Sequence, residues 1–439
     1  MSFSIQASVQ DILKGHGTHH RAAGGAIVKH RVGGWLPRNH EVMRKWLERK
    51  IAYVDHPTRR NEPLHPVIQQ FQEFIERDAI VYMGFHQMFE QVPTKPPYNE
   101  DPSGKPQVRD YQLMLRLFNH IIRTAPAYED DDLVGFPINA ILDWPMGTPA
   151  GMAMFSRPDV NEHFHHMFEA WAEFLGSEAS TVVLNDSPTG WFGGPASVAI
   201  PDFVDTYLCD PSLPHYGYKS WDDFFTRLFR DGVRPVSFPE DDSYINSACE
   251  STVYRIATSV KANDHFWLKG QPYSLEHMLN FDELASQFAG GTVYQAFLAA
   301  TKYHRWHAPV NGRVVRVDMI PGTYYAESPF EGFPDPDAAG PNLSQAFITS
   351  VATRALIYIE ANNSDIGLMC FIAVGMAEVS TCEVTVKEGD VINKGDELGM
   401  FHFGGSTHCL IFRPETKVTF APDVHIEADV KLNVPIAKV

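Results

Sequence analysis

The chain has 439 residues, of which 44% are hydrophobic and 21% charged, as in soluble globular proteins large enough for two or three domains. No apolar run approaches the ~18 residues of a membrane span, and the N-terminus lacks the apolar core of a secretory signal. Five scattered cysteines without a CxxC pair argue against a disulfide framework and a structural zinc site. We therefore expect a cytoplasmic protein.

The net charge of −18 is unevenly distributed, because residues 1–60 carry eleven Lys or Arg against four Asp or Glu. The acidic remainder disfavours nucleic acid and anionic lipid as partners. We interpret residues 1–60 as a basic N-terminal arm with a short surface helix near 38–54. A targeting segment is the alternative for this arm.

Residues 61–200 are expected to form a helical N-terminal domain. Apolar residues recur there with a period near 3.6, which indicates helices that bury one face. Three such stripes are Val67, Ile68, Phe71, Phe74 and Ile75; Met114, Leu117, Phe118 and Ile121; and Phe164, Met167, Phe168, Trp171, Phe174 and Leu175.

Residues 201–439 are expected to form a β-rich C-terminal domain, with strands near 313–317, 355–359, 368–374 and 383–386 and a long loop over 326–346. Stretches 307–315 and 386–396 both join short apolar runs by tight glycine turns, similar to the hairpins of lipoyl/biotinyl-type sandwich barrels. The predicted fold class is α+β, with the helical N-terminal half packed on this domain.

Two histidines three residues apart, His304 and His307, lie in the polar-aromatic segment Tyr303 to Pro309. In an extended segment they need not share a face, so they can perform different tasks. Histidine is well suited to transfer protons near neutral pH. No set of metal ligands has a recognisable spacing; the segment from His40 has Arg44 where a zincin helix needs its second histidine, so no metal is predicted.

A serine follows two glycines in the sequence Gly404-Gly405-Ser406-Thr407. Glycine allows strained backbone conformations and close approach to the main chain. Ser406 can then attack the carbonyl on its N-terminal side, cutting the chain between Gly405 and Ser406 and leaving a new carbonyl group at residue 406. Alone, such a turn is more often a simple loop.

Four sequence blocks occur in a fixed order and together resemble the phosphatidylserine decarboxylase family of pyruvoyl enzymes. They are WDDFFTR at 221–227 with Arg234-Pro235; Lys269-Gly270 with Tyr273-Ser274-Leu275; YHRWHAP at 303–309 continuing to Pro321-Gly322; and KGDELGMF at 394–401 ending in Gly405-Ser406-Thr407.

The resemblance implies that Ser406 becomes a pyruvoyl group, a covalent cofactor made by autocatalytic cleavage of a zymogen. The large fragment, 1–405, and the small fragment, 406–439, would remain associated. The group would form a Schiff base with a substrate amine and withdraw electrons as CO₂ leaves. By the family pattern His304 assists decarboxylation and protonation, and His307 is the base for the cleaving serine.

Two departures from the family pattern concern carboxylates. Glu250 stands where the family has an Asp-Gly pair, so Glu250 would be the acid partner of the cleavage histidine; the alternative is a solvated surface glutamate. Glu378 is an added charge in a neutral stretch after Val374-Gly375, near the expected pocket. It is a candidate substrate-binding residue or a structural one.

These departures, the double glycine and the long helical half look similar to a soluble fungal branch of L-tryptophan decarboxylases. Trp306, between the two histidines, fits that branch and is a second candidate substrate contact. The favoured function is a pyruvoyl-dependent decarboxylase of a free aromatic amino acid, making tryptamine and CO₂ from L-tryptophan without stable membrane association. The alternatives are a phosphatidylserine decarboxylase making phosphatidylethanolamine and, as a minor one, a non-enzymatic sandwich-barrel binding module.

Overall fold

The computed structural model describes residues 40–92, 108–129, 136–264, 272–327, 344–379, 381–403 and 406–439. Most of the predicted basic arm, most of the predicted 326–346 loop, the Lys269-Gly270 pair and both glycines of the predicted cleavage site lie outside these residues. Ser406 and both candidate histidines lie within them.

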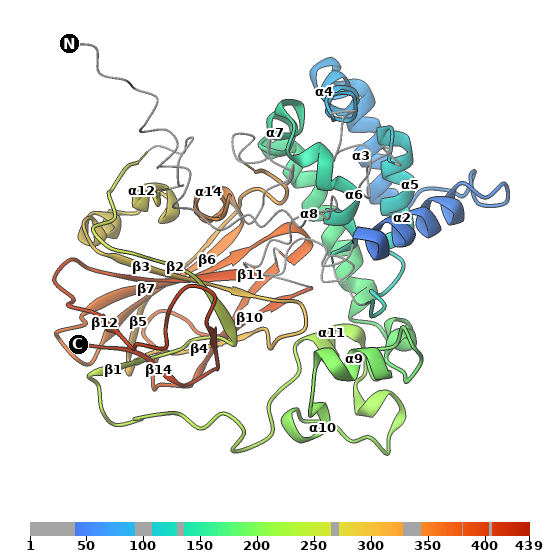
Figure 1. Cartoon of the computed structure of the whole chain (residues 1–439). Coiled ribbons are helices and arrows are strands. Elements are labelled where there is room, and N and C mark those ends of the chain that lie inside the picture. Colours follow the sequence, from blue (N-terminus) through green and yellow to red (C-terminus); the bar gives the residue numbers. More distant parts are fainter. Residues whose placement is uncertain are drawn as a thin grey trace, which may run out of the picture.

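The N-terminal half is helical, as predicted (Figure 1). Helices α3, α5 and α8 bury most residues of the three apolar stripes, and α2 lies within the helix predicted near 38–54. The α-helices and 3₁₀ helices of this half are α2 (His40–Val54), α3 (Pro66–Arg77), α4 (Ala79–Glu90), α5 (Tyr111–Ile121), α6 (Pro137–Met146), α7 (Pro149–Phe155), α8 (Pro158–Leu175), η2 (Glu178–Val183), α9 (Gly194–Ala199), α10 (Phe203–Thr206), η3 (Pro214–Gly217) and α11 (Trp221–Phe225).

Side-chain caps set where several of these helices begin. Asp78 Oδ1 accepts hydrogen bonds from the backbone N–H groups of Ile80 and Val81 at 2.8 and 3.0 Å, at the start of α4. Asp110 Oδ1 accepts from the N–H of Leu113 in α5 at 2.6 Å. Such caps satisfy N–H groups that the helix cannot pair internally.

The described part of the C-terminal half contains three antiparallel sheets and a few short helices. Its elements are β1 (Tyr244–Asn246), β2 (Ser251–Ala257), α12 (Leu275–Met278), η4 (Glu283–Phe288), β3 (Thr292–Leu298), β4 (Arg305–His307), β5 (Gly312–Ile320), α14 (Gln345–Val351), β6 (Arg354–Ala361), β7 (Leu368–Gly375), η5 (Ala377–Val379), β8 (Thr381–Val384), β9 (Val391–Ile392), β10 (Glu397–His402), β11 (Ser406–Phe412), β12 (Thr419–Phe420), β13 (Asp429–Val430) and β14 (Pro435–Lys438). The large sheet has the order β13-β2-β3-β11-β7-β6-β5-β9, and the two small sheets have the orders β4-β10-β8 and β1-β14-β12.

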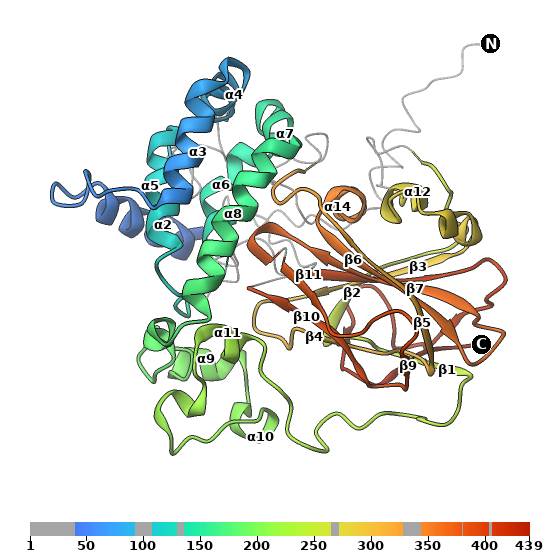
Figure 2. The same ribbon diagram turned by 180° about the vertical axis from the view of Figure 1, so that it is seen from behind.

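Both faces of the large sheet are covered, which explains why β7 and β11 are buried along their whole length without alternation. Successive residues of β7 point to opposite faces. Cys370, Ile372 and Val374 pack in a cluster with α12 and α14, whereas Phe371 and Ala373 pack in the cluster that contains the small sheets and the helical half. Figure 2 shows α12 and α14 beside the sheet and the long helix α8 next to β10 and β11.

The predicted α+β class is confirmed, and three of the four predicted strands lie within β5, β6 and β7. The fourth prediction, 383–386, is partly wrong, because β8 runs from Thr381 to Val384. A turn begins just beyond it, where the Lys387 N–H donates to Asp390 Oδ2 at 3.0 Å and draws the chain out of the sheet.

The two stretches with similar hairpin patterns pair with each other. Gly312 of β5 lies opposite Ile392 of β9. The N–H of Gly395 donates to the carbonyl of Ala308 at 2.9 Å, and the N–H of Ala308 donates to the carbonyl of Asp396 at 2.7 Å. This pairing ties the segment after His307 to the segment that leads into β10.

Candidate active site around Ser406

Ser406 is the first residue of β11, a central strand of the large sheet. It lies opposite Leu298 of β3 on one side and Gly375 of β7 on the other. Its side chain is buried, and its hydroxyl has no hydrogen-bond partner among the described residues. A buried polar group without a partner is costly and often has a functional reason.

The direction of the Ser406 side chain follows from that of its neighbours. Thr407 Oγ1 accepts a hydrogen bond from Gln295 Nε2 at 3.0 Å, and Gln295 also contacts α14. Thr407 therefore faces the α14 side of the sheet. Because neighbouring strand residues point to opposite faces, Ser406 and His408 face the other side.

The small sheet β4-β10-β8 covers that other side. The ring of Trp306 in β4 lies 5.5 Å from the ring of Phe371 in β7, and Phe371 lies 5.9 Å from the ring of His408, between ring centroids. The hydroxyl of Ser406 and the strand between the two candidate histidines are thus on the same side of the large sheet.

His304 lies at the end of β4 nearest the predicted cleavage bond. Its carbonyl accepts a hydrogen bond at 2.9 Å from the N–H of Phe401, five residues before Ser406. Its buried ring stacks on Phe225 of α11 with 4.1 Å between centroids. His304 is therefore held beside the end of β10 that leads to Ser406.

His307 lies at the opposite end of β4, where it pairs with Glu397. Its Nδ1 is 2.7 Å from the carbonyl oxygen of Gly395, which only accepts, so Nδ1 carries the proton. Its Nε2 then accepts from the Tyr303 hydroxyl at 3.0 Å. Burial lowers the pKa of His307 and outweighs the opposing contact with Gly395. The ring is thus a neutral imidazole of defined tautomer.

Glu250 is in an ion pair rather than in water. Its carboxylate accepts hydrogen bonds from Arg234 and, at 3.0 Å, from the N–H of Leu432, and its side chain is 13% exposed, unlike a solvated surface glutamate. The backbone brings its segment to His307, whose N–H donates to the carbonyl of Ala248 at 2.9 Å. The expected direct contact between the two side chains is not formed here, because both have other partners.

Glu378 joins the two halves of the molecule. Its Oε1 accepts a hydrogen bond from the N–H of Ile138 at the start of α6, and its Oε2 accepts from the hydroxyl of Tyr325, both at 3.0 Å. Complete burial raises its pKa to about 7, although these donors oppose the shift. Both oxygens bind protein groups, so these contacts favour the structural alternative for Glu378 over substrate binding.

Trp306 is fully buried in the core, and its ring centroid lies 4.9 Å from that of Phe401 and 5.5 Å from that of Phe371. These are the contacts of a residue that packs the small sheet onto the large one. They favour a structural role over the substrate contact expected from the sequence.

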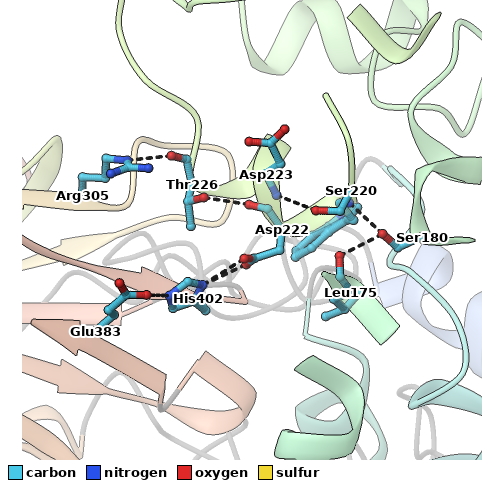
Figure 3. Close-up of polar contacts among 10 residues, drawn as sticks. Leu175, Ser180, Ser220, Asp222, Asp223, Thr226, Arg305, Glu383 and His402 are labelled. Carbon is cyan, nitrogen blue, oxygen red and sulfur yellow. Dashed lines mark hydrogen bonds and ion pairs between the residues drawn. The ribbon is translucent and has the colours of Figure 1, made fainter. Parts of the chain in front are cut away.

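A cluster around His402, the last residue of β10, was not anticipated. Its Nδ1 lies 3.0 Å from Asp222 of α11, and its Nε2 lies 2.9 Å from Glu383 of β8 (Figure 3). A histidine four residues before Ser406 was visible in the sequence. Its two carboxylate partners were not, because they are 180 and 19 residues away in the chain.

The described residues contain neither a membrane span nor a metal site. Within these ranges, no helix is long and apolar enough to cross a membrane. The same residues contain no group of three or more His, Cys, Asp or Glu side chains arranged to hold a metal ion.

Comparison with known proteins gives matches over most of the chain. Two family models, both described as phosphatidylserine decarboxylase, match residues 65–200 and 221–438. The chain is 46% identical over 320 residues to Decarboxylase iboD of Amanita muscaria (strain Koide BX008), covering 70% of this chain and 91% of that protein.

Two further relatives differ in how much of this chain they match. The L-tryptophan decarboxylase of Psilocybe cubensis is 38% identical over 404 residues, covering 88% of this chain and 89% of that protein. Phosphatidylserine decarboxylase proenzyme 3 of Schizosaccharomyces pombe is 33% identical over 212 residues, covering 48% of this chain and 21% of that protein. The match to the tryptophan decarboxylase therefore includes the helical half.

Proposed function

This chain belongs to the phosphatidylserine decarboxylase family and is a carboxy-lyase, and from that premise we propose that it decarboxylates a free aromatic L-amino acid, with L-tryptophan as the first candidate. The non-enzymatic binding-module alternative is wrong, because this family and these relatives are decarboxylases. The observation that carries the proposal is the buried, unpartnered hydroxyl of Ser406 on the face that β4 covers.

The cofactor is proposed to arise from Ser406 itself. Its Oγ attacks the carbonyl carbon of residue 405, gives its proton to a base, and displaces the amide nitrogen to form an ester. Elimination leaves a carboxylate on residue 405 and dehydroalanine at 406, and addition of water with loss of ammonia leaves a ketone. The resulting pyruvoyl group supplies an electron-withdrawing carbonyl for the loss of CO₂.

The position of His304 supports its proposed part in decarboxylation and protonation, because it lies beside the segment that leads into Ser406. A neutral ring with an accepting Nε2 is the form that a base requires, which supports the proposal that His307 acts in cleavage. Its place at the end of β4 away from Ser406, on the face opposite to Trp306, and its hydrogen bond from Tyr303 count against it. Glu250 is proposed as its acid partner; the backbone contact between their segments supports this, and the ion pair with Arg234 competes with it.

The substrate proposal rests on how much of this chain each relative matches. The protein named as an L-tryptophan decarboxylase matches 88% of this chain, including the helical half. The relative from Amanita muscaria supports decarboxylation, but its name states no substrate. A test on several amino acids is therefore needed.

Two measurements on the purified protein test this function. Intact mass under denaturing conditions is expected to give fragments 1–405 and 406–439, the small one with a blocked N-terminus. Incubation with L-tryptophan is expected to give tryptamine, with L-tyrosine and L-phenylalanine as competitors. Complete cleavage without product from any aromatic amino acid would exclude the proposed substrate class, and an active, unbroken chain would exclude the cofactor.

Phosphatidylserine decarboxylation is the second candidate, since both family models carry that description. Such an enzyme must reach a lipid at a membrane. Co-sedimentation with liposomes, together with conversion of their phosphatidylserine to phosphatidylethanolamine, would favour this candidate over the first.

A further inference from the structure

We propose that His402 is a positioning residue for self-cleavage: its ring, held between Asp222 and Glu383, fixes the end of β10 from which the chain crosses to Ser406. The inference rests on the proposed function, because it concerns how the scissile bond is presented. It adds His402 to the residues that the proposed function names.

The contacts of His402 involve three separate elements (Figure 3). Nδ1 lies 3.0 and 3.1 Å from the two carboxylate oxygens of Asp222, and Nε2 lies 2.9 Å from Glu383 Oε2. The side chain of His402 is 15% exposed, that of Asp222 22% and that of Glu383 55%. Exposed ion pairs contribute little, so Asp222 is expected to be the stronger anchor.

Helix α11, which carries Asp222, is fixed at both ends. At its start the N–H of Trp221 donates to Ser180 Oγ at 2.8 Å, and that hydroxyl donates to the carbonyl of Leu175 at 2.8 Å. At its end Arg305 Nε donates to the carbonyl of Thr226 at 2.7 Å. Asp222 is therefore a rigid support for the His402 ring.

The crossing from His402 to Ser406 is short. β10 belongs to the small sheet and β11 to the large one, and packed sheets lie about 10 Å apart. Four Cα–Cα steps span at most roughly 14 Å. Phe403 follows His402 and has a left-handed backbone conformation, with φ 66°. Its ring stacks on Trp171 of α8. Because only three residues separate His402 from Ser406, we expect a displacement of His402 to shift the bond before Ser406.

The charge on His402 strengthens this anchor. Burial lowers the pKa of His402, but hydrogen bonds and attraction from Asp222 and Glu383 outweigh burial, so the pKa lies above its usual value. Asp222 and Glu383 are the charged groups that contact the ring from α11 and β8. On β4, Arg305 is engaged by Glu397 at 2.7 Å. The two carboxylates thus favour the protonated form of the ring.

The test follows cleavage of freshly synthesised full-length chain over time on denaturing gels. The variant His402→Gln keeps hydrogen-bonding groups but not the charge, and His402→Lys keeps the charge. Asp222→Asn and Glu383→Gln remove the partners one at a time, and His425→Gln changes an exposed histidine as the matched control. Thermal unfolding of each change in an uncleavable Ser406→Ala background shows whether the variants fold.

We expect His402→Gln and Asp222→Asn to slow cleavage roughly tenfold to a hundredfold, because small misplacements of reacting groups have effects of that size. Glu383→Gln should slow it less, and His402→Lys should restore most of the rate. The wild-type rate divided by the His402→Lys rate should fall as pH rises through the pKa of His402, since lysine keeps its charge.

Cleavage of His402→Gln at the wild-type rate, or failure of His402→Lys to rescue a folded chain, would overturn the inference alone. A folded wild-type chain that never cleaves would instead contradict the proposed function, and this inference with it.

Discussion

Ser406 on β11 lies directly opposite Gly375 on β7. Directly paired residues point to the same face, with Cβ atoms about 4.5–5.5 Å apart. Residue 375 therefore places no side chain beside that of Ser406, whereas Leu298 lies on the other side.

We predict that Gly375→Val lowers both cleavage and amine formation at least about tenfold, because its side chain would project beside Ser406 and displace it. Gly194→Ala is the matched control, since a Cβ there meets nothing within 4 Å. Densitometry of the fragments and an amine assay measure the two effects. Normal activity of Gly375→Val would show that neither step requires residue 375 to lack a side chain.

The three residues at the centre of the proposed chemistry should give different phenotypes. Ser406→Ala is expected to stay uncleaved and inactive, and His307→Ala to block cleavage. His304→Ala is expected to cleave yet to lose roughly a hundredfold or more in decarboxylation, the range for a general acid or base. Mass spectrometry and amine assays separate the two losses. Full turnover by His304→Ala would disprove the role assigned to it.

Glu250 and Arg234 provide a test of the proposed acid partner. If Glu250 orients His307, Glu250→Gln should slow cleavage while Arg234→Ala, which leaves the carboxylate in place, should slow it much less. If the ion pair with Arg234 is its whole function, both variants should slow cleavage equally. Cleavage half-times of the two variants, measured on samples with the same folded fraction, distinguish the two results.

The fragments are expected to remain together after cleavage. β11 lies between β3 and β7, which belong to the large fragment, and β14 pairs with β1 in the same way. Size-exclusion chromatography should therefore give one peak containing both fragments, and denaturant should separate them. Loss of the small fragment from the native protein would contradict this prediction.

Glu378 should make stability fall as pH rises. Its pKa is raised by burial to about 7 in the folded chain, so between about pH 4.5 and pH 7 the folded state binds more protons than the unfolded state. At about 1.4 kcal/mol per pKa unit, the loss over this range is about 3 kcal/mol. Urea unfolding in the Ser406→Ala background should show this slope, and adding Glu378→Gln should remove it. If the slope is the same with and without Glu378→Gln, Glu378 is ionised over this whole pH range in the folded chain.

The sequence predicted features that depend on local pattern. The period of apolar residues located α3, α5 and α8, and uninterrupted apolar runs located β6 and β7. The order of the motifs located Ser406 and the two histidines along the chain. Each of these signals lies within a short window, where side-chain direction follows from helix or strand geometry.

Pairings between distant segments were not predictable in the same way. The partners of His402 come from α11 and β8, and Glu378 caps α6, 240 residues earlier in the chain. The position of Glu250 matched the family pattern, yet its ion pair with Arg234 depends on how two loops pack. Such contacts are set by tertiary packing, which the local pattern of a single sequence does not reveal.

The stack of Phe403 on Trp171 has a consequence for the proposed self-cleavage. A chain reduced to 201–439 would keep Ser406 and both histidines, yet it would lack the ring against which the residue before Gly404-Gly405 is packed. Acquisition of the proposed cofactor is then expected to depend on prior folding of the helical half. Self-cleavage would act as a checkpoint on assembly, so that misfolded copies remain inert precursors.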